Sequence, residues 1–240
     1  MGDFAAGYSR SAIDRSGLVL RDTVLRRDQA GRDVRDALVT LIAFRETFQK
    51  PLNKTVMGLR SMVRSESPDL KRTGGRIPVA QRLKREEQIV FKLARLPDTR
   101  LSNMGDVGGC RAVLADRSRV DGVVKRIKKN WRVHGRIRDT RDEPAESGYR
   151  AVHVIVVRDG RRIEVQLRTP REHEWAVAVE RTGIRLGIGL KEGEGPDDLK
   201  EYFRLAGQGL YLESQGVQAD PAFQREFEAS RNRVRHYFQR

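Results

Sequence analysis

The sequence has a single cysteine, fewer acidic than basic residues and no long apolar run. With Cys110 alone, an internal disulfide framework is excluded, and this cysteine content fits a reducing compartment. No stretch approaches the about 18 consecutive apolar residues of a membrane-spanning helix. The region after Met1 also lacks the apolar core of a signal peptide. We therefore expect a cytoplasmic protein that does not associate with a membrane.

The excess of basic over acidic residues gives the chain a strong positive charge. Its 240 residues include 48 lysines and arginines but 33 aspartates and glutamates, a net charge of +15. A field of this sign concentrates polyanions such as nucleotides, RNA or an acidic protein. The alternative is a charge that only serves solubility. We expect a nucleic acid or a phosphorylated ligand.

Common motifs of metal and cofactor sites are also missing. The four histidines, at 134, 153, 173 and 236, have no metal-ligand spacing, so a zinc site is not expected. The sequence contains neither a Walker motif nor a dinucleotide-binding glycine motif, and it shows no internal repeat.

Apolar periodicity and helix-breaking residues predict the helices. Residues 1–26 are polar with no clear period, and we expect them either to be loosely ordered or to lie on the domain. Residues 65–75 have the composition of a polar linker, and Pro78 is expected to begin a helix. The predicted helices span residues 32–48, 52–64, 78–96, 118–130, 170–183, 197–213 and 221–239.

Four strands are predicted, at residues 107–114, 131–139, 152–157 and 161–169. The continuous apolar run 152–157 is typical of a strand buried on both faces, and Asp159-Gly160 predicts a tight turn after it. The fold class is therefore α/β (α+β), a mixed β-sheet flanked by helices. We expect an N-terminal helical extension over 1–75, a central domain over 76–183, and a C-terminal helical extension over 184–240 packed on that domain.

The strand 161–169 is the most informative stretch. Its apolar residues alternate with Glu164, Gln166 and Arg168, so one face of the strand carries a carboxylate, an amide and a guanidinium. Asp106 lies just before another apolar strand. Two carboxylates beside cations suit a magnesium ion and phosphate oxygens. These residues can meet only if their two strands are neighbours in the sheet.

Cations accompany both acids. On the predicted helix 78–96, Lys84, Gln88, Lys92 and Arg95 form one stripe, which is either a solvated face or a cradle for a polyphosphate. The pair Gly108-Gly109 permits a close backbone approach after Asp106. Arg111 is placed either to reach a phosphate or to pair with Asp106.

Two further segments suggest contacts with nucleic acid. Tyr149, which follows a glycine at a strand end, is either a stacking platform for a base or a packing residue, and His153 lies on the same face of a regular strand. A basic helix carries Lys125, Arg126, Lys128 and Lys129, which we expect to bind RNA.

Taken together, these motifs resemble the RelA/SpoT alarmone synthetase domain over roughly residues 76–180. The matching motifs are Arg82-x-Lys84, Lys92 with Arg95, Asp106-x-Gly108-Gly109-x-Arg111, Gly148-Tyr149-Arg150-x-x-His153 and Glu164-x-Gln166-x-Arg168-Thr169. With no upstream hydrolase domain and no long regulatory tail in this sequence, the chain is similar to the small single-domain synthetases, including the toxic members of toxin–antitoxin and phage-defence systems.

The resemblance implies a nucleotidyltransferase-like fold and transfer of pyrophosphate from ATP to a ribose 3′-hydroxyl. It implies that Asp106 and Glu164 are the catalytic residues and hold Mg²⁺, with Glu164 helping to deprotonate the acceptor. The implied ATP-binding residues are Arg82, Lys84, Gln88, Lys92, Arg95 and Arg111. The implied acceptor-binding residues are Tyr149, Arg150, His153, Gln166 and Arg168.

The sequence departs from the family pattern at three places. Gln88 replaces a serine common in the ATP-binding helix, and Ala145 replaces a lysine that guanine-nucleotide synthetases commonly carry ahead of the tyrosine. Thr140-Arg141 stands where a Tyr-Ile pair is usual. These changes leave the ATP chemistry intact and weaken the match to a guanine-nucleotide acceptor.

Three hypotheses follow. The first is a toxin that transfers pyrophosphate to the 3′ CCA end of tRNA and so blocks translation. The second is a synthetase of the alarmones (p)ppGpp or (p)ppApp from free nucleotides. The third is an inactive RNA-binding regulator, against which we count the desolvation cost of keeping two buried acids without a metal. An antitoxin protein or a second copy of the chain are the partners that the C-terminal segment Asp220 to Arg240 suggests, besides core packing.

Overall fold

The computed structural model describes residues 7–26, 31–73, 79–190 and 193–239. They form two compact units. Unit 1 comprises Met1–Ala112, Asp121–Ile137 and His153–Gln166, and unit 2 comprises Val113–Val120, Arg138–Val152 and Leu167–Arg240. The predicted domain boundaries after residues 75 and 183 stay a prediction. Each unit combines segments that alternate along the chain, so the units do not test those boundaries.

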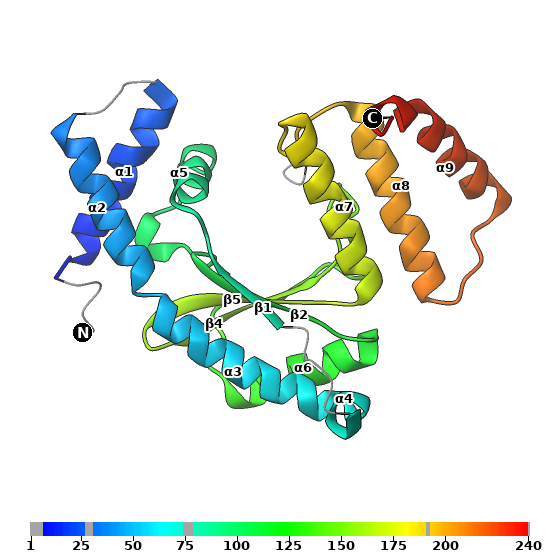
Figure 1. Cartoon of the computed structure of the whole chain (residues 1–240), viewed down its shortest axis with the longest axis horizontal. Helices are drawn as coiled ribbons and strands as arrows, with labels where there is room; N and C mark the ends of the chain where they lie inside the picture. The colour runs from blue at the N-terminus through cyan, green and yellow to red at the C-terminus, as the bar shows by residue number, and fades with distance from the viewer. Residues whose placement is uncertain (1–6, 27–30, 74–78, 191–192, 240) are drawn as a thin grey trace. The chain divides into compact units, whose positions relative to one another are not determined.

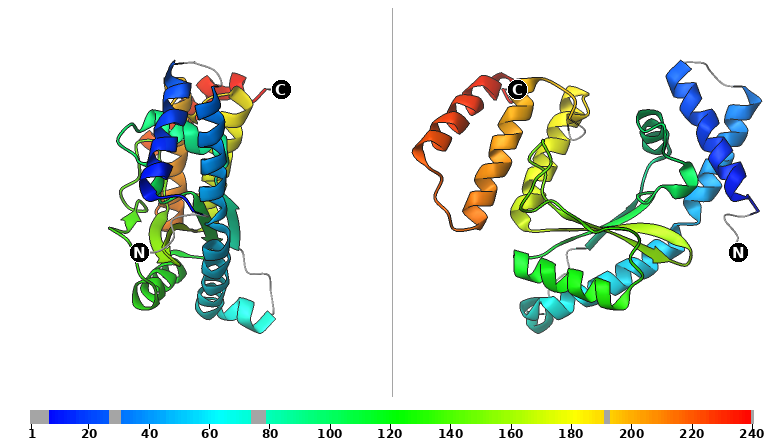
Figure 2. Two further views of the ribbon diagram at one scale, coloured as in Figure 1. Left: turned by 90° about the vertical axis from the view of Figure 1, so that its left-hand side faces the viewer. Right: turned by 180° about the vertical axis from the view of Figure 1, so that it is seen from behind.

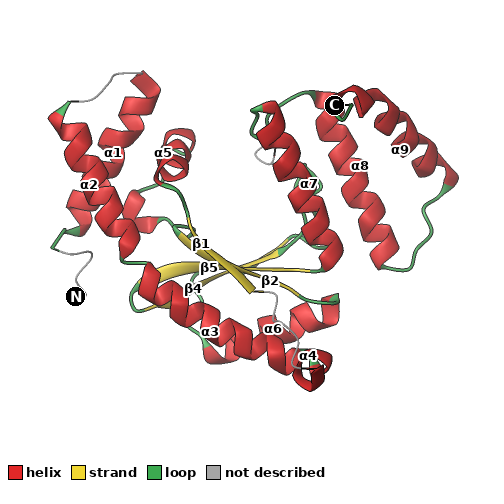
Figure 3. Ribbon diagram, viewed as in Figure 1, coloured by secondary structure: helices red, strands yellow, loops and turns green. Residues whose placement is uncertain are grey.

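A five-stranded sheet has the order β1-β2-β5-β4-β3. Its strands are β1 (Val79–Leu83), β2 (Gly108–Val113), β3 (Arg138–Asp139), β4 (Val152–Arg158) and β5 (Arg161–Arg168). β1 pairs with β2 in antiparallel register, with Arg82 opposite Gly109. The predicted mixed sheet flanked by helices is confirmed (Figure 3).

Unit 1 contains the helices of the N-terminal half of the chain. They are α1 (Arg10–Arg26), α2 (Arg32–Glu46), α3 (Gln49–Glu66), α4 (Pro68–Thr73), α5 (Glu86–Arg95), the 3₁₀ turn η1 (Leu101–Asn103) and most of α6 (Arg117–Asn130). α3 and α6 lie side by side on one face of the sheet (Figures 1 and 2). A Cβ built on Gly108 would meet Phe48, just before α3, at 3.4 Å, so that face is closely packed.

Burial alternates along β5 as predicted. Ile163 and Val165 are fully buried and Glu164 and Gln166 are half-buried, so the two residue sets point to opposite faces. β4 also alternates: Val154 and Val156 are buried, while His153 and its face are half-buried. The prediction that β4 is buried on both faces was therefore wrong. The turn Asp159-Gly160 is confirmed by φ angles of 47° and 75°.

The predicted helix 78–96 was wrong in its first half. Residues 74–78, including Pro78, lie outside the described part of the chain, but Val79–Leu83 form strand β1. Their hydrogen bonds to β2 come from a segment almost thirty residues away, so local periodicity does not reveal them. The helix begins at Glu86, where Glu86 and Glu87 place carboxylates in its first turn.

Residues 10–26 of the N-terminal segment pack on the rest of unit 1, which is the second of the two expected arrangements. Residues 10–26 form α1 and bury Ile13, Gly17 and Leu20 at a helical spacing, and part of the expected linker forms α4. Between residues 131 and 139 the structure has an isolated bridge at Val133 and the short β3 instead of one strand. Within the described residues, no helix has the length and apolarity needed to cross a membrane.

Unit 2 contains the three predicted C-terminal helices, which lie next to one another in Figure 1. They are α7 (Pro170–Leu186), α8 (Asp197–Ser214) and α9 (Pro221–Val234), followed by the turn η3 (Arg235–Tyr237). A capping box between Thr169 and Glu172 begins α7. Trp175, Val179 and Phe203 share one buried cluster with Tyr149, so the C-terminal helices form the core of this unit.

Candidate active site

The strand that follows Asp106 and the strand that carries Glu164 are neighbours in the sheet. β2, which follows Asp106, lies next to β5, which carries Glu164, as the sequence analysis required. A Cβ built on Gly109 would lie 3.9 Å from Glu164 Oε2, so the glutamate side chain extends over the bare backbone of β2. The register thus brings the glutamate to the strand that begins just after the aspartate.

Two lysines hold Asp106. Its Oδ2 atom accepts hydrogen bonds from Lys84 Nζ at 2.8 Å and from Lys92 Nζ at 2.7 Å. Burial alone would raise the pKa of the Asp106 carboxyl, but the two ammonium groups outweigh burial and hold this pKa below its ordinary value. The Oδ1 atom is buried and has no hydrogen-bond partner in the described part of the chain.

The two lysines come from different elements. The backbone of Lys84 donates to Val107 O at 2.8 Å, and Arg45 Nε donates to Lys84 O at 2.7 Å, so this lysine is anchored from two sides. Arg45 also pairs with Glu86 at 3.1 Å, at the start of the helix that carries Lys92. Sequence analysis missed Arg45, because nothing in its neighbourhood signals a contact 39 residues away.

Glu164 is held by His153 and Gln166, two of the predicted acceptor-binding residues. Its Oε1 atom is 2.8 Å from His153 Nδ1, and its Oε2 atom accepts a hydrogen bond from Gln166 Nε2 at 2.7 Å. Burial raises the pKa of Glu164 and the charge of Asp106 raises it further, but His153 and Gln166 outweigh both and lower this pKa. The carboxylate is therefore ionised at neutral pH.

The loop before Asp106 has anchors that sequence analysis also missed. Arg162, on the same face of β5 as Glu164, donates to Asn103 O at 2.8 Å. From α1, Asp14 accepts from the Ser102 backbone at 2.9 Å and Arg10 donates to Asn103 Oδ1 at 2.6 Å. The N-terminal helix therefore helps to fix the segment that presents Asp106.

The other predicted ATP-binding residues surround this pair at lower burial. Arg82 is exposed and lies directly opposite Gly109, so it shares the face of Glu164. Arg111 is half-buried and follows Gly109 by two residues on that same face. Gln88 and Arg95 are exposed on α5, one turn before and one turn after Lys92. Their role in ATP binding stays a prediction.

The donor set fits a magnesium ion that is completed by a substrate. The described residues contain no group of three or more His, Cys, Asp or Glu able to hold a metal. Mg²⁺ is usually bound by one or two carboxylates together with waters and substrate phosphates. Asp106 and Glu164 meet that need, and the unpartnered Asp106 Oδ1 atom is a ligand of the required kind.

In unit 2, the predicted acceptor-binding residues Tyr149 and Arg168 contact each other. Arg168 donates to Tyr149 Oη at 2.7 Å, and the tyrosine ring lies 6.1 Å from that of Trp175. Tyr149 is 6% exposed, which is the packing arrangement that the sequence left open. Base stacking on this ring stays a prediction, and it requires the ring to become exposed.

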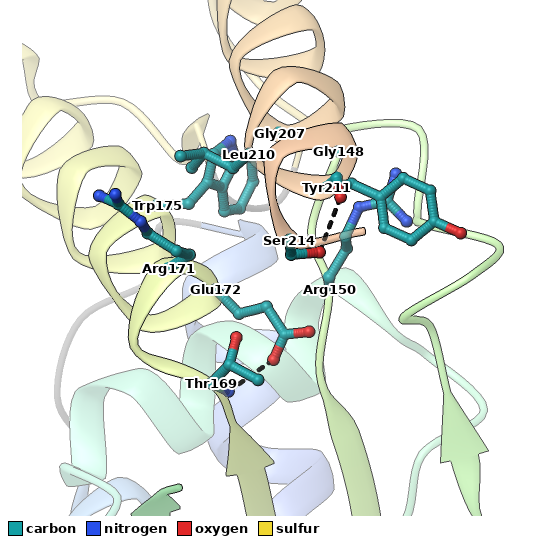
Figure 4. A pocket seen from close by; sticks show the side chains of 10 residues that line it. All are labelled: Gly148, Arg150, Thr169, Arg171, Glu172, Trp175, Gly207, Leu210, Tyr211 and Ser214. Atoms are coloured by element: carbon teal, nitrogen blue, oxygen red, sulfur yellow. Dashed lines mark hydrogen bonds between the residues drawn. The ribbon is translucent and has the colours of Figure 1, made fainter. Parts of the chain in front are cut away.

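Arg150 joins the segment around Tyr149 to α8. It donates to Arg141 O and, at 3.0 Å, to Gln208 Oε1, and its guanidinium lies 4.1 Å from the centre of the Tyr211 ring. These residues border a pocket (Figure 4). The pocket is lined by Gly148, Arg150, Thr169, Arg171, Glu172, Trp175, Gly207, Leu210, Tyr211 and Ser214.

Two glycines allow the loop that ends at Tyr149 to touch α8 directly. Gly148 has a φ of +84°, and a Cβ there would meet Arg204 Cα at 3.0 Å. A Cβ on Gly207 would lie 2.8 Å from Gly148 O. Backbone therefore packs against backbone at this point, and only glycine fits on both sides.

The predicted RNA-binding residues lie on α6. Lys125, Lys128 and Lys129 are exposed, and Arg126 pairs with Glu66 of α3. α6 packs on the sheet face that buries Val165, whereas Glu164 points to the other face. RNA bound along α6 would therefore have to pass round an edge of the sheet to approach the carboxylates.

We expect Asp106→Asn to lower the free energy of unfolding by about 1–3 kcal/mol at neutral pH, because it removes charged hydrogen bonds and leaves two ammonium groups facing each other. The folded-state pKa of Asp106 lies below 3.8, so the difference from the unaltered chain should be complete above that value and should shrink as the pH falls through the lowered pKa. Urea titrations from about pH 7 to pH 3 measure it. Asp98→Asn, at an exposed carboxyl, is the control; a difference that does not vary with pH would contradict the assignment.

We expect Gly207→Ala to destabilise the protein by about 1–3 kcal/mol, because its Cβ would overlap Gly148 O. Gly209→Ala, in the same helix, is a matched control whose Cβ would be 3.7 Å from Phe223. The control gains helix propensity without a clash and should be neutral or stabilising by up to about 1 kcal/mol. Denaturant unfolding of the two variants compares them, and equal stabilities would argue against the backbone contact.

Comparison with known proteins identifies the central region. Residues 81–184 match the region found in RelA and SpoT proteins. An uncharacterized protein of Mycobacterium tuberculosis and one of Mycobacterium bovis are each 32% identical over 126 residues, covering 50% of this chain and 45% of each relative. The matched part of the chain thus spans less than half the length of these curated relatives.

Solved structures share the fold. A GTP pyrophosphokinase family protein from Streptococcus pneumoniae has a TM-score of 0.56 at 24% identity, covering 71% of this chain and 89% of that one. Small alarmone synthetase 1 from Bacillus subtilis, bound to its product pppGpp, has a TM-score of 0.57 at 21% identity, covering 71% and 93%. Residues 81–184 therefore carry the region found in RelA and SpoT proteins, on a fold shared with small alarmone synthetases.

Proposed function

We propose that the chain is a magnesium-dependent pyrophosphokinase, which transfers pyrophosphate from ATP to a ribose 3′-hydroxyl. The observation that carries the proposal is the pairing of Asp106 with Lys84 and Lys92, just before strand β2, which lies next to the strand that carries Glu164. Two acids and two cations on neighbouring elements are the components that phosphoryl transfer requires. The match of residues 81–184 to the RelA and SpoT region supports the same reaction.

In this proposal, Asp106 and Glu164 hold the magnesium ion, which neutralises charge on the triphosphate. Lys84 and Lys92 bind phosphate oxygens of ATP, aided by the more exposed cations of β1, β2 and α5. Arg82, Arg95 and Arg111 are these cations, and Gln88 adds an amide. Because Lys84 and Lys92 now donate to Asp106, they are already positioned beside the acid when ATP arrives.

The transfer itself balances without a covalent intermediate on the protein. The acceptor oxygen bonds to the β-phosphorus, the bond from that phosphorus to the α–β bridging oxygen breaks, and AMP leaves. The acceptor proton passes to the Glu164 carboxylate, which His153 and Gln166 keep ionised and oriented. The main contribution of the protein is to align the attacking oxygen with the leaving group.

For the acceptor, we propose the 3′ CCA end of tRNA, which would make the protein a toxin that blocks translation. The support is the net charge of +15 and the exposed cations of α6. The replacement of the family's lysine by Ala145, between Glu143 and Glu146, also disfavours a guanine nucleotide. A protein antitoxin would be the natural partner of such an activity.

The second candidate is an alarmone synthetase that acts on free guanine or adenine nucleotides. It is supported by the shared fold with a small alarmone synthetase that was solved with its product pppGpp. The same carboxylates and cations would serve either acceptor, so the choice depends on the residues that contact the acceptor.

An inactive RNA-binding regulator is the weakest candidate, but for a different reason than the sequence indicates. The cost of burying Asp106 is offset by Lys84 and Lys92, so desolvation alone does not argue for a metal. The buried Asp106 Oδ1 atom, which has no partner among the described residues, does argue for a metal. An unused carboxylate oxygen would cost stability in a module that binds no ion.

The decisive experiment incubates the purified chain with Mg²⁺ and γ-labelled ATP, and with deacylated tRNA or a GDP/GTP mixture. We expect label in the tRNA band, and we expect Glu164→Gln to reduce its rate by about 10²–10⁴-fold, since that change removes the base. Label only in small nucleotides would replace the first candidate by the second. No transfer to any acceptor, with ATP and Mg²⁺ present, would refute the pyrophosphokinase.

A double variant, Lys125→Ala with Lys128→Ala, separates RNA binding from chemistry. Both side chains are exposed on α6 and lie away from Asp106 and Glu164. Transfer to tRNA should weaken while the affinity for ATP is unchanged, and an unaltered rate with tRNA would argue against α6 as an RNA surface.

A further inference from the structure

The segment that follows the middle of α6 is strongly cationic. Residues 122–137 contain six lysines and arginines and no acidic residue. All six side chains are exposed, and they are Lys125, Arg126, Lys128, Lys129, Arg132 and Arg136. Apart from the pair of Arg126 with Glu66, the structure gives them no ion pair within the described residues. Their charge is therefore available to a polyanion.

A hollow opens in the middle of this segment. It is lined by Lys128, Trp131, Val133, Gly135, Arg136 and Ile137. Its walls thus combine apolar side chains and an aromatic ring with two cations, and Gly135, at a φ of +68°, contributes bare backbone. Such a combination suits a flat apolar group that is attached to negative charges.

The Trp131 ring is held in place from below. A Cβ built on Gly58 of α3 would lie 2.7 Å from Trp131 Cζ2, so the ring rests on helix backbone. The guanidinium of Arg158 lies 4.9 Å from the ring centre, and its Nε atom is buried with no hydrogen-bond partner among the described residues. The tryptophan is half-buried and fixed, which lowers the entropy cost of stacking a ligand on it.

We propose that this hollow binds a base of single-stranded RNA, with Trp131 as the stacking platform and Lys128 and Arg136 on the flanking phosphates. Aromatic stacking combined with a basic track is the usual way to hold a single strand. The inference deepens the proposed function and rests on it for the choice of RNA. An acidic protein would pair with the cations but would place no flat aromatic group in the hollow, so RNA fits both features better.

The hollow lies where a bound RNA strand can continue to the other face of the sheet. Val133 pairs with Val156 of β4, whose side chain belongs to the face covered by α3. By alternation, Arg132 and His134 point to the opposite face, which is that of His153 and Glu164. Both are exposed, so an RNA strand that leaves the hollow meets the guanidinium of Arg132 and the ring of His134 on the way to the carboxylates.

Fluorescence quenching tests the proposal directly. The chain has two tryptophans, and Trp175 is only 5% exposed, so quenching by a short single-stranded RNA ending in CCA reports on Trp131. We expect quenching with the unaltered chain and an affinity about tenfold lower in Trp131→Ala. Trp131→Phe should lose the signal but keep most of the affinity in a competition assay, because phenylalanine also stacks. Lys128→Ala should reduce the slope of log K against log salt concentration by about 0.7, because one phosphate contact is lost.

Phe238→Ala is the matched control, since it removes another exposed aromatic ring that lies under an arginine, Arg185. It should leave RNA affinity unchanged, and circular dichroism checks that each variant is folded. The same affinity in Trp131→Ala and the unaltered chain would overturn the proposal, as would equal quenching by polyglutamate. Because binding is measured without ATP, failure here leaves pyrophosphate transfer standing, and failure of transfer leaves the binding result intact.

Discussion

The carboxylate of Asp106, shared between the ammonium groups of Lys84 and Lys92, is the interaction on which the arrangement of unit 1 depends. One lysine follows β1 and the other lies on α5, so a single oxygen atom joins two elements to the start of β2. Arg45 ties the same junction to α2 through the Lys84 backbone and Glu86. Lys84, Lys92 and Arg45 each have an oxygen partner in this cluster, which offsets the cost of burying their charges. Asp106 Oδ1, which has no hydrogen-bond partner among the described residues, is the atom best suited to a ligand.

The part of this site that could be predicted is the part encoded by local alternation. The apolar and polar residues of 161–169 define the two faces of β5, and this pattern is enough to assign the carboxylate, amide and guanidinium to one face. The pairing of Asp106 with both lysines and the contact of His153 with Glu164 depend on strand order. That order could be stated only as a requirement. The resemblance to the alarmone synthetase domain supplied the roles, which alternation alone does not give.

The features that escaped prediction are non-local. β1 was predicted as the start of a helix because its hydrogen bonds are made to β2, and α1 was missed because its apolar positions, Ile13 and Leu20, are sparse. Arg10, Asp14 and Arg45 gave no sequence signal, since an arginine or aspartate on a helix is usually solvated. Arg162, on β5, gave none either, because its contact with Asn103 joins residues far apart in the sequence. Tyr149 shows the opposite problem: a glycine before an aromatic fits both a stacking platform and a packed core, and the structure has the packed core.

In unit 2, the C-terminal helices do more than cover apolar surface, because α8 also contacts the loop before Tyr149. The loop that ends at Tyr149 touches α8 through Gly148 and Gly207, and Arg150 stacks on Tyr211. The conformation of the predicted acceptor loop is therefore a property of α8 as much as of the loop itself. Substitutions in α8 can therefore alter the conformation of this loop without touching a carboxylate.

The lysine pair on Asp106 has one more consequence. Zinc-dependent domains unfold when a chelator removes their ion, because nothing else compensates the charged ligands. Here the chain supplies its own counter-charges, so the folded architecture does not rely on an ion being present. Cellular magnesium and ATP would then govern how fast such an enzyme works, and their binding would add to a stability that the chain has without them.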